Sequence, residues 1–172
     1  MWLIRKIPPS EIPLGTEEVA QFLRLDESDE TELATVRNLV AAATSIAENY
    51  TQRSFMTQTW QLGINTLPTR LRLPRPPVQK IETIQAGEFT IDSSAYKLYD
   101  ESMLMCSFEM SNYADDIVIT YVAGYESAEE VPSDIRQAIL MLTGYLYENR
   151  EGAGEVPEAV KQLLDPYKVL KI

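Results

Sequence analysis

The side chains able to carry out chemistry are few in this sequence, and the commonest catalytic side chain is missing. Among its 172 residues there is no histidine, and there is one cysteine, Cys106. Without histidine a Ser–His or Cys–His nucleophile is excluded, and one cysteine cannot hold a structural zinc ion. The seven glycines are scattered and form no phosphate-binding pattern. The sequence therefore predicts no nucleophile of these types, no metal and no cofactor.

Acidic residues remain as candidates, and they include two adjacent pairs, Asp115–Asp116 and Glu129–Glu130. Catalysis by two carboxylates requires both groups to face one substrate. Neighbouring residues of a strand point to opposite faces, and in a loop such residues are usually solvated. The pairs therefore give little support to a carboxylate hydrolase.

A denser acidic cluster, Asp26 to Glu32, has five carboxylates in seven residues. As a calcium loop it lacks a glycine at the sixth position, and its twelfth residue is Arg37 instead of glutamate. We interpret the cluster as a loop that leads into a helix. In this interpretation Asp29 is the N-cap and Glu32 completes a capping box.

The chain has a formal net charge of −11, and its basic residues concentrate in one place, at Arg70, Arg72, Arg75 and Lys80. This group forms either a patch that faces DNA or an acidic partner, or a set of solvated charges that protect an edge strand from aggregation. Tight wrapping of a nucleic acid depends on neutralising phosphates with Lys and Arg, so the overall acidity argues against it. The acidity fits a protein past which DNA slides, and it also fits solubility alone.

The composition predicts a single globular domain over residues 1–172, with 45% hydrophobic residues. The single cysteine, which we expect to be half-buried, suits a reducing compartment such as a bacterial cytoplasm. The sequence predicts no signal peptide, and no apolar run approaches the roughly 18 residues that a membrane span needs.

Four helices are expected. Thr16 caps a short helix over 17–23, and a long helix runs over 30–50 with apolar residues spaced by three and four. Ser133 caps a helix over 134–150 that Gly152 and Gly154 end. Pro157 begins a last short helix, which stops before Pro166.

Between the helical parts the pattern changes to short strands. Alternating or β-branched segments predict strands at 60–64, 81–84, 89–91, 96–99, 103–108 and 117–122, the last of these most strongly. The proline-rich segment 71–78 fits an edge or a connection. Residues 1–15, with three prolines, are expected to be an extended arm or edge segment.

The predicted fold class is therefore α+β, a small bundle of about four helices with an inserted small antiparallel β module. The helical parts are 16–55 and 131–167, the β insertion is about 56–125, and an apolar tail covers 167–172.

The two longer helices carry more apolar surface than one core requires. Leu39 and Ile46 widen the stripe of the first, and Met141 and Tyr145 form a second flank on the other. Such faces serve either a contact with an adjacent subunit or a broad interface within a monomer.

The order of these motifs resembles the head–tail connector (adaptor) proteins of long-tailed phages and prophages. The resemblance covers residues 16–60, 73–78 and 118–167. The segments that carry it are LRLD at 23–26, ENYTQR at 48–53, LPRPPV at 73–78, YVAGY at 121–125, VPSDIRQA at 131–138, YENR at 147–150 and VP at 156–157.

This resemblance implies a structural virion protein at the head–tail junction, which has no catalytic residues, is not an enzyme and is assembled in the host cytoplasm. It would form a ring, generally of twelve copies, under the portal protein, extend the DNA channel and dock the stopper or tail. DNA would pass without sequence-specific binding, and no membrane is involved. The residues expected to form subunit contacts are Leu39, Ile46, Met141 and Tyr145. The tail, through Val169, Leu170 and Ile172, is expected to dock on the portal by strand addition.

Two other interpretations stay open. One is a different ring component, such as a head-closure or tail-completion protein. The other is a monomeric regulatory or peptide-binding module that uses the β insertion.

Overall fold

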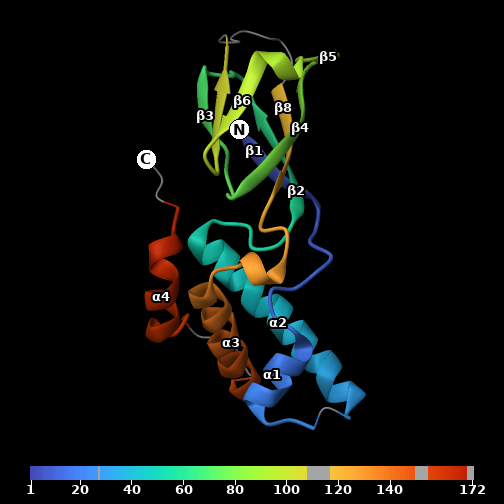
Figure 1. The fold of residues 1–172 in the computed structure, drawn as a ribbon, viewed down its shortest axis with the longest axis vertical. Helices are drawn as coiled ribbons and strands as arrows, with labels where there is room; N and C mark the ends of the chain where they lie inside the picture. The colour runs from blue at the N-terminus through green and yellow to red at the C-terminus, as the bar shows by residue number, and fades with distance from the viewer. Residues whose placement is uncertain (27, 108–116, 150–154, 170–172) are drawn as a thin grey trace. The chain divides into compact units, whose positions relative to one another are not determined.

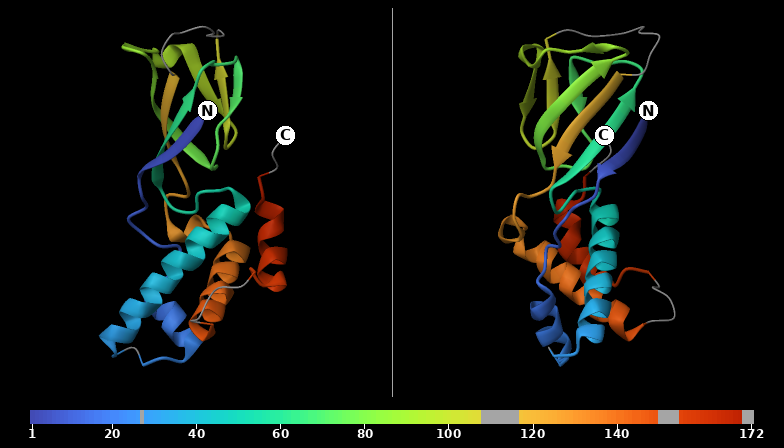
Figure 2. Two further views of the ribbon diagram at one scale, coloured as in Figure 1. Left: turned by 180° about the vertical axis from the view of Figure 1, so that it is seen from behind. Right: turned by 90° about the vertical axis from the view of Figure 1, so that its right-hand side faces the viewer.

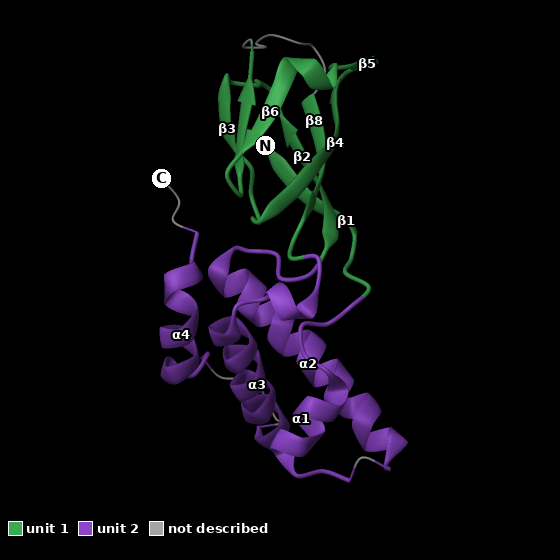
Figure 3. Ribbon diagram, viewed as in Figure 1, with its two compact units in different colours: residues 1–10, 57–125 green, residues 11–56, 126–172 purple. Residues whose placement is uncertain are grey.

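The computed structural model describes residues 1–172 except 27, 108–116, 150–154 and 170–172. The chain divides into two compact units (Figures 1 and 3). A β unit comprises residues 1–10 and 57–125, and a helical unit comprises residues 11–56 and 126–172. The predicted α+β class is confirmed, and every strand pair of the described residues is antiparallel.

The β unit contains two sheets. The strands are β1 (Trp2–Ile7), β2 (Gln58–Ile64), β3 (Arg70–Arg72), β4 (Val78–Ala86), β5 (Phe89–Thr90), β6 (Tyr96–Tyr99), β7 (Met103–Cys106) and β8 (Ile117–Ala123). The larger sheet has the order β1-β2-β8-β4-β5, and the smaller has the order β3-β7-β6. Both sheets contribute side chains to one hydrophobic core, over which they pack (Figure 2).

The centre of the larger sheet is β8, the strand that the sequence predicts most strongly. Its register against β2 places Trp60 opposite Tyr121 and Leu62 opposite Ile119. All four of these side chains are buried. β-branched and aromatic side chains pack well against such cross-strand neighbours, which accounts for the central position of β8.

The predicted edge segment at the N-terminus is the edge strand β1, paired with β2. Trp2 lies opposite Gly63, and its indole ring lies against the backbone of β2. A Cβ atom at position 63 would stand 2.0 Å from Trp2 Cε2. The glycine is therefore what allows this close approach.

The helical unit contains α1 (Thr16–Leu23), α2 (Glu30–Thr51), α3 (Ser133–Glu148) and α4 (Glu158–Leu164). α3 contacts each of the other three helices (Figure 2). The predicted stripe of α2 is buried at Val36, Val40, Ala43 and Ala47. The buried apolar residues of α3 are Ile135, Ala138, Ile139, Leu142 and Leu146.

The predicted helix starts are partly wrong. Asp29 is the N-cap of α2, and its carboxylate accepts hydrogen bonds from the amides of Thr31 and Glu32. Glu32, however, completes no capping box, because its carboxylate accepts a 2.6 Å hydrogen bond from Tyr147 of α3. The Asp29 amide donates to the carbonyl of Asp26 instead. Glu32 thus accepts a hydrogen bond from the distant Tyr147 in place of the Asp29 amide that a capping box would use.

Neither of the other two predicted caps is an N-cap. Thr16 and Ser133 are the first residues of their helices, and the N-caps are Gly15 and Pro132, without side-chain caps. In both cases the preceding residue already has the extended backbone of an N-cap, so each helix begins one residue earlier than the sequence predicts. α3 ends at Glu148, and Gly152 and Gly154 lie outside the described residues.

The end of α2 is fastened by a buried carboxylate. Glu48 is only 5% exposed, and it accepts a 2.7 Å hydrogen bond from the amide of Phe55. Between them the chain turns at Gln52, whose φ of 59° is left-handed. Glu48 therefore holds the connection that leads from α2 towards β2.

Candidate assembly surfaces

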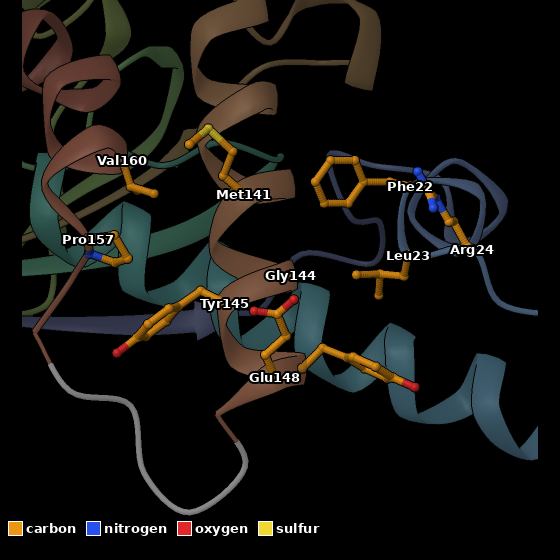
Figure 4. Close-up of a pocket in the computed structure, with 10 residues that line it drawn as sticks. Phe22, Leu23, Arg24, Met141, Gly144, Tyr145, Glu148, Pro157 and Val160 are labelled. Carbon is orange, nitrogen blue, oxygen red and sulfur yellow. The ribbon is translucent and has the colours of Figure 1, made fainter.

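A groove lies between α1, α3 and the start of α4, all within the helical unit (Figure 4). Its volume is about 520 Å³. The apolar side chains that line it include Phe22, Leu23, Met141, Tyr145 and Val160, with Gly144 beside them. A pocket of this size accepts a small molecule or a segment of a partner.

Phe22 and Gly144 give the groove its shape. Phe22 is 47% exposed, and its ring faces α3 across the groove. A Cβ at position 144 would stand 3.1 Å from Phe22 Cε1, so the glycine lets the ring approach α3. The sequence prediction overlooked Phe22, although a large aromatic residue on the outer face of a short helix could have indicated it.

The four predicted interface residues are all half-buried, but they separate into two groups. Met141 and Tyr145 line the groove, whereas Leu39 and Ile46 lie on α2 and are not among the lining residues. The groove therefore brings together only the pair on α3.

The groove has an exposed charge on each side. Arg24 lies at the end of α1 and Glu148 at the end of α3 (Figure 4). A partner with one charged side chain would therefore have a preferred orientation in the groove.

The chain's last described residues are bound to the end of α2, and we call residues 165–169 with 50–53 the C-terminal clasp. The Tyr50 hydroxyl donates a 2.5 Å hydrogen bond to Asp165, and Lys168 Nζ lies 4.3 Å from the centroid of the Tyr50 ring. Arg53 Nε donates to the carbonyl of Tyr167 at 2.7 Å.

The clasp also holds Val169, one of the predicted portal-docking residues. Its amide donates a 2.9 Å hydrogen bond to the carbonyl of Thr51, the last residue of α2. The last carbonyls of a helix lack partners within it, so this bond satisfies one of them. Leu170 and Ile172, the other two, lie outside the described residues.

The clasp should be visible in the titration of Tyr50. Its hydrogen bond to the Asp165 carboxylate raises the pKa of Tyr50 to about 12, from a usual 10.0. The hydrogen bond therefore stabilises the clasp fully below pH 10 and is lost as the pH rises through about 12. We expect ¹³C NMR of labelled tyrosine to show this late ionisation, and Asp165→Asn to shift it back towards 10.

Tyr121 is the matched control, because its hydroxyl donates to the carbonyl of Pro74 in the β unit. Burial raises the pKa of Tyr121, and Asp165→Asn should not change it. Ionisation of Tyr50 at pH 10 in the unmodified protein would show that the clasp is open in solution.

The predicted basic patch is spread over two sheets. Arg70 and Arg72 are exposed on β3, an edge strand of the smaller sheet, and Lys80 is exposed on β4 of the larger. Arg75 lies between these strands in sequence, and its guanidinium stands 5.4 Å from the centroid of the Trp60 ring.

Arg5 joins this group although the sequence prediction did not include it. Its guanidinium lies 5.7 Å from the Trp60 ring centroid, and it donates a hydrogen bond to Gln58. Two arginines thus share one indole ring by cation–π contact. Only the pairing of β1 with β2 brings Arg5 there, and no local sequence signal indicates that pairing.

The net charge is divided unequally between the two units. The β unit has seven Lys and Arg against eight Asp and Glu in its sequence, a net −1. The helical unit has eight against eighteen, a net −10, and the two together give the chain's −11. The acidity of the chain is thus a property of the helical unit.

The part of the chain that the structure describes also bears on two further kinds of site, a metal site and a membrane-spanning helix. No group of three or more Asp, Glu or Cys side chains is placed to hold a metal ion there. Among those residues, no helix has the length and apolar character that crossing a membrane requires.

Comparison with known proteins decides the family. The family model described as head completion protein matches residues 14–155. The chain belongs to the head completion protein family. The predicted kinship with connector proteins of phage-like particles is thereby confirmed, and membership of a head completion family implies a structural part in a particle and no catalytic one.

Solved structures show that this head completion family member has a fold seen in particle necks. One similar chain is in a structure described as the neck of an empty GTA particle computed with C6 symmetry, with a TM-score of 0.85 and 20% identity. Another is in the virion of a native gene transfer agent (GTA) particle, with a TM-score of 0.82 and 20% identity. A third is in the neck of a native GTA particle computed with C12 symmetry, with a TM-score of 0.78 and 20% identity.

Each of these similarities covers 100% of this chain and 97% of the other chain. Both units of the family member therefore have counterparts in the solved chains. No curated protein matches the sequence.

Proposed function

We propose that this protein is an adaptor subunit, which forms a ring under the portal of a phage-like particle, extends the DNA channel and docks the stopper or tail. The observation that carries the proposal is the likeness of the whole chain, in both units, to chains of GTA necks, at a TM-score of 0.85. The family match over residues 14–155 supports it.

Ring formation is supported by the symmetry of the similar particles, whose necks are described with C6 and C12 symmetry. A ring of more than two subunits requires two different, complementary surfaces on each subunit. We assign the half-buried flanks at Leu39 and Ile46, and at Met141 and Tyr145, to contacts with neighbouring subunits, without requiring that the two flanks meet each other. About twelve copies, as in the connector family, would be the expected ring.

The net charge of each unit bears on which part of the subunit can border a DNA channel. The helical unit, at net −10, repels phosphates, so it can border a channel without binding DNA tightly. The exposed Arg70, Arg72 and Lys80 of the nearly neutral β unit are better suited to an acidic protein surface than to DNA wrapping. No sequence-specific contact with DNA is proposed.

The C-terminal tail is the proposed portal contact. The clasp holds Val169 at the end of α2 through the hydrogen bond from its amide to the Thr51 carbonyl. Leu170 and Ile172 then supply apolar side chains for strand addition to the portal. Residues 167–169 serve the clasp, so the informative truncation removes residues 170–172 alone.

We expect the full chain to co-sediment with purified portal rings of the same phage, and the chain without residues 170–172 to lose this binding. The truncated chain should keep its thermal unfolding temperature, because the removed residues follow the clasp. A matched control, Leu170→Ala with Ile172→Ala, should weaken binding as much as the truncation. Unchanged portal binding by the truncated chain would discard the tail as the contact.

The family description favours one second candidate, a head-closure protein. Such a protein would bind portal rings only after an adaptor ring is in place. Direct binding to bare portal rings therefore supports the adaptor assignment, and binding only to adaptor-loaded rings supports head closure.

A further inference from the structure

The groove between α1, α3 and α4 is an open apolar surface of the helical unit, and the β unit carries an exposed aromatic residue at a hairpin tip. The groove holds about 520 Å³, more than one aromatic ring occupies, and its apolar lining includes the half-exposed Phe22. Apolar pockets of this size that remain open to solvent mark binding sites.

The matching segment is the tip of the β4–β5 hairpin. Phe89 is 74% exposed, more than any other aromatic side chain among the exposed large apolar residues of the described chain. Ala86 pairs with Phe89, so only Gly87 and Glu88 form the turn, and Gly87 adopts the left-handed φ of 58° that such tight turns require. The hairpin therefore presents Glu88 and Phe89 together at its exposed tip.

The charged residues at the hairpin tip and beside the groove favour one orientation of the hairpin in the groove. Glu88 is exposed next to Phe89, while the groove carries exposed Arg24 on its α1 side and exposed Glu148 on its α3 side (Figure 4). A hairpin tip inserted with Glu88 towards α1 meets the cation, and the reverse orientation places Glu88 near Glu148. Complementary charges of this kind fix register more than they add affinity.

We propose that the groove of one copy binds the β4–β5 hairpin tip of a second copy, with Phe89 entering between Phe22 and Met141 and Glu88 facing Arg24. The two surfaces are different, so the contact is head-to-tail and can close into a ring. The proposal deepens the proposed function and rests on it for the ring. The contact itself is tested without the portal.

Disulfide trapping tests the contact directly. In a Cys106→Ser background, Phe89→Cys protein is mixed with Met141→Cys protein at high concentration and oxidised. We expect a heterodimer that forms faster than the homodimer of either variant. A chain that carries both substitutions should give a ladder of covalent oligomers on a reducing-agent-free gel.

Two matched variants keep this test specific. Tyr99→Cys, an exposed aromatic position of the same unit, should trap Met141→Cys poorly. Ile4→Cys, on the exposed edge strand β1, tests an exposed aliphatic position of the same unit as the occupant of the groove. Faster trapping by Ile4→Cys or Tyr99→Cys than by Phe89→Cys overturns the choice of hairpin. A disulfide within the doubly substituted monomer, or no trapping at all, overturns the contact between copies.

Charge reversal tests the orientation. Glu88→Arg alone and Arg24→Glu alone should each slow trapping by roughly two- to fivefold, as expected for an exposed ion pair. Mixing Glu88→Arg on the Phe89→Cys chain with Arg24→Glu on the Met141→Cys chain should restore the original rate. Additive slowing in this pair would contradict the contact between Glu88 and Arg24. Failure of portal binding with normal trapping would count against the adaptor assignment alone.

Discussion

Gly63→Ala is expected to lower the free energy of unfolding by about 2 kcal/mol, because it forces the Trp2 ring off the β unit. The added methyl group would stand 2.0 Å from Trp2 Cε2 and 2.2 Å from Nε1. No real contact is that short, so one group must leave. β2 is held by pairing on both of its edges, whereas Trp2 lies on β1, the edge strand, which pairs with β2 on one side only in the described sheet. The indole ring is therefore the part that moves.

Urea denaturation followed by tryptophan fluorescence measures both consequences at once. The midpoint should fall, and the emission of the folded state should shift to the red as Trp2 enters water. Trp60 is only 8% exposed in the core, so its emission should not shift and forms a constant part of the spectrum.

A double-mutant cycle isolates the cause. In a Trp2→Ala background the added methyl group meets no ring, and Gly63→Ala should cost less than about 0.5 kcal/mol or even stabilise the strand. An equal loss in both backgrounds would mean that the substitution acts through the backbone of β2 and not through Trp2.

Glu48→Ala is expected to destabilise the helical unit by about 3 kcal/mol, because it leaves the buried amide of Phe55 without its 2.7 Å carboxylate acceptor. The side chain is 5% exposed, so water cannot easily replace it. Glu48→Gln keeps an acceptor oxygen and should cost distinctly less, about 1 kcal/mol.

Hydrogen exchange locates this effect. The Phe55 amide should lose its protection in Glu48→Ala and keep most of it in Glu48→Gln. Ser45→Ala, at an exposed position of the same helix, is the matched control and should change stability by at most about 0.5 kcal/mol. Equal destabilisation by Glu48→Gln and Glu48→Ala would show that the charge of Glu48, and not its hydrogen bond to Phe55, supports the connection.

The elements that the sequence predicted well are those with a strong local signal. The stripe of α2 follows a helical period from Val36 to Ala47, and β8 is dense in β-branched residues, so tertiary context only reinforced these preferences. The α+β class followed from such segments. The starts of the helices were predicted less well, because the position of an N-cap depends on the backbone conformation of one residue, as at Gly15 and Pro132.

The surfaces were harder to predict because residues distant in sequence build them. Met141 was recognised as part of an extra apolar flank, but the groove also needs Phe22 from α1, more than a hundred residues earlier. Arg5 reaches Trp60 only through the pairing of β1 with β2. The clasp likewise joins Tyr50 to Asp165. The periodicity of one helix or strand carries no information about contacts between elements that are distant in the sequence.

The order of the strands along the chain has a consequence for biosynthesis. Trp2 leaves the ribosome well before its partner Gly63, which follows only after the whole of α1 and α2 has been made. The central strand β8 is later still, and β2 and β4 have no common neighbour until it arrives. The nascent chain therefore carries an unpaired apolar strand, Trp2–Ile7, while helices form behind it. Pro8 and Pro9 next to that strand, and the cations Arg5 and Lys6 within it, are features that restrain premature pairing with other chains.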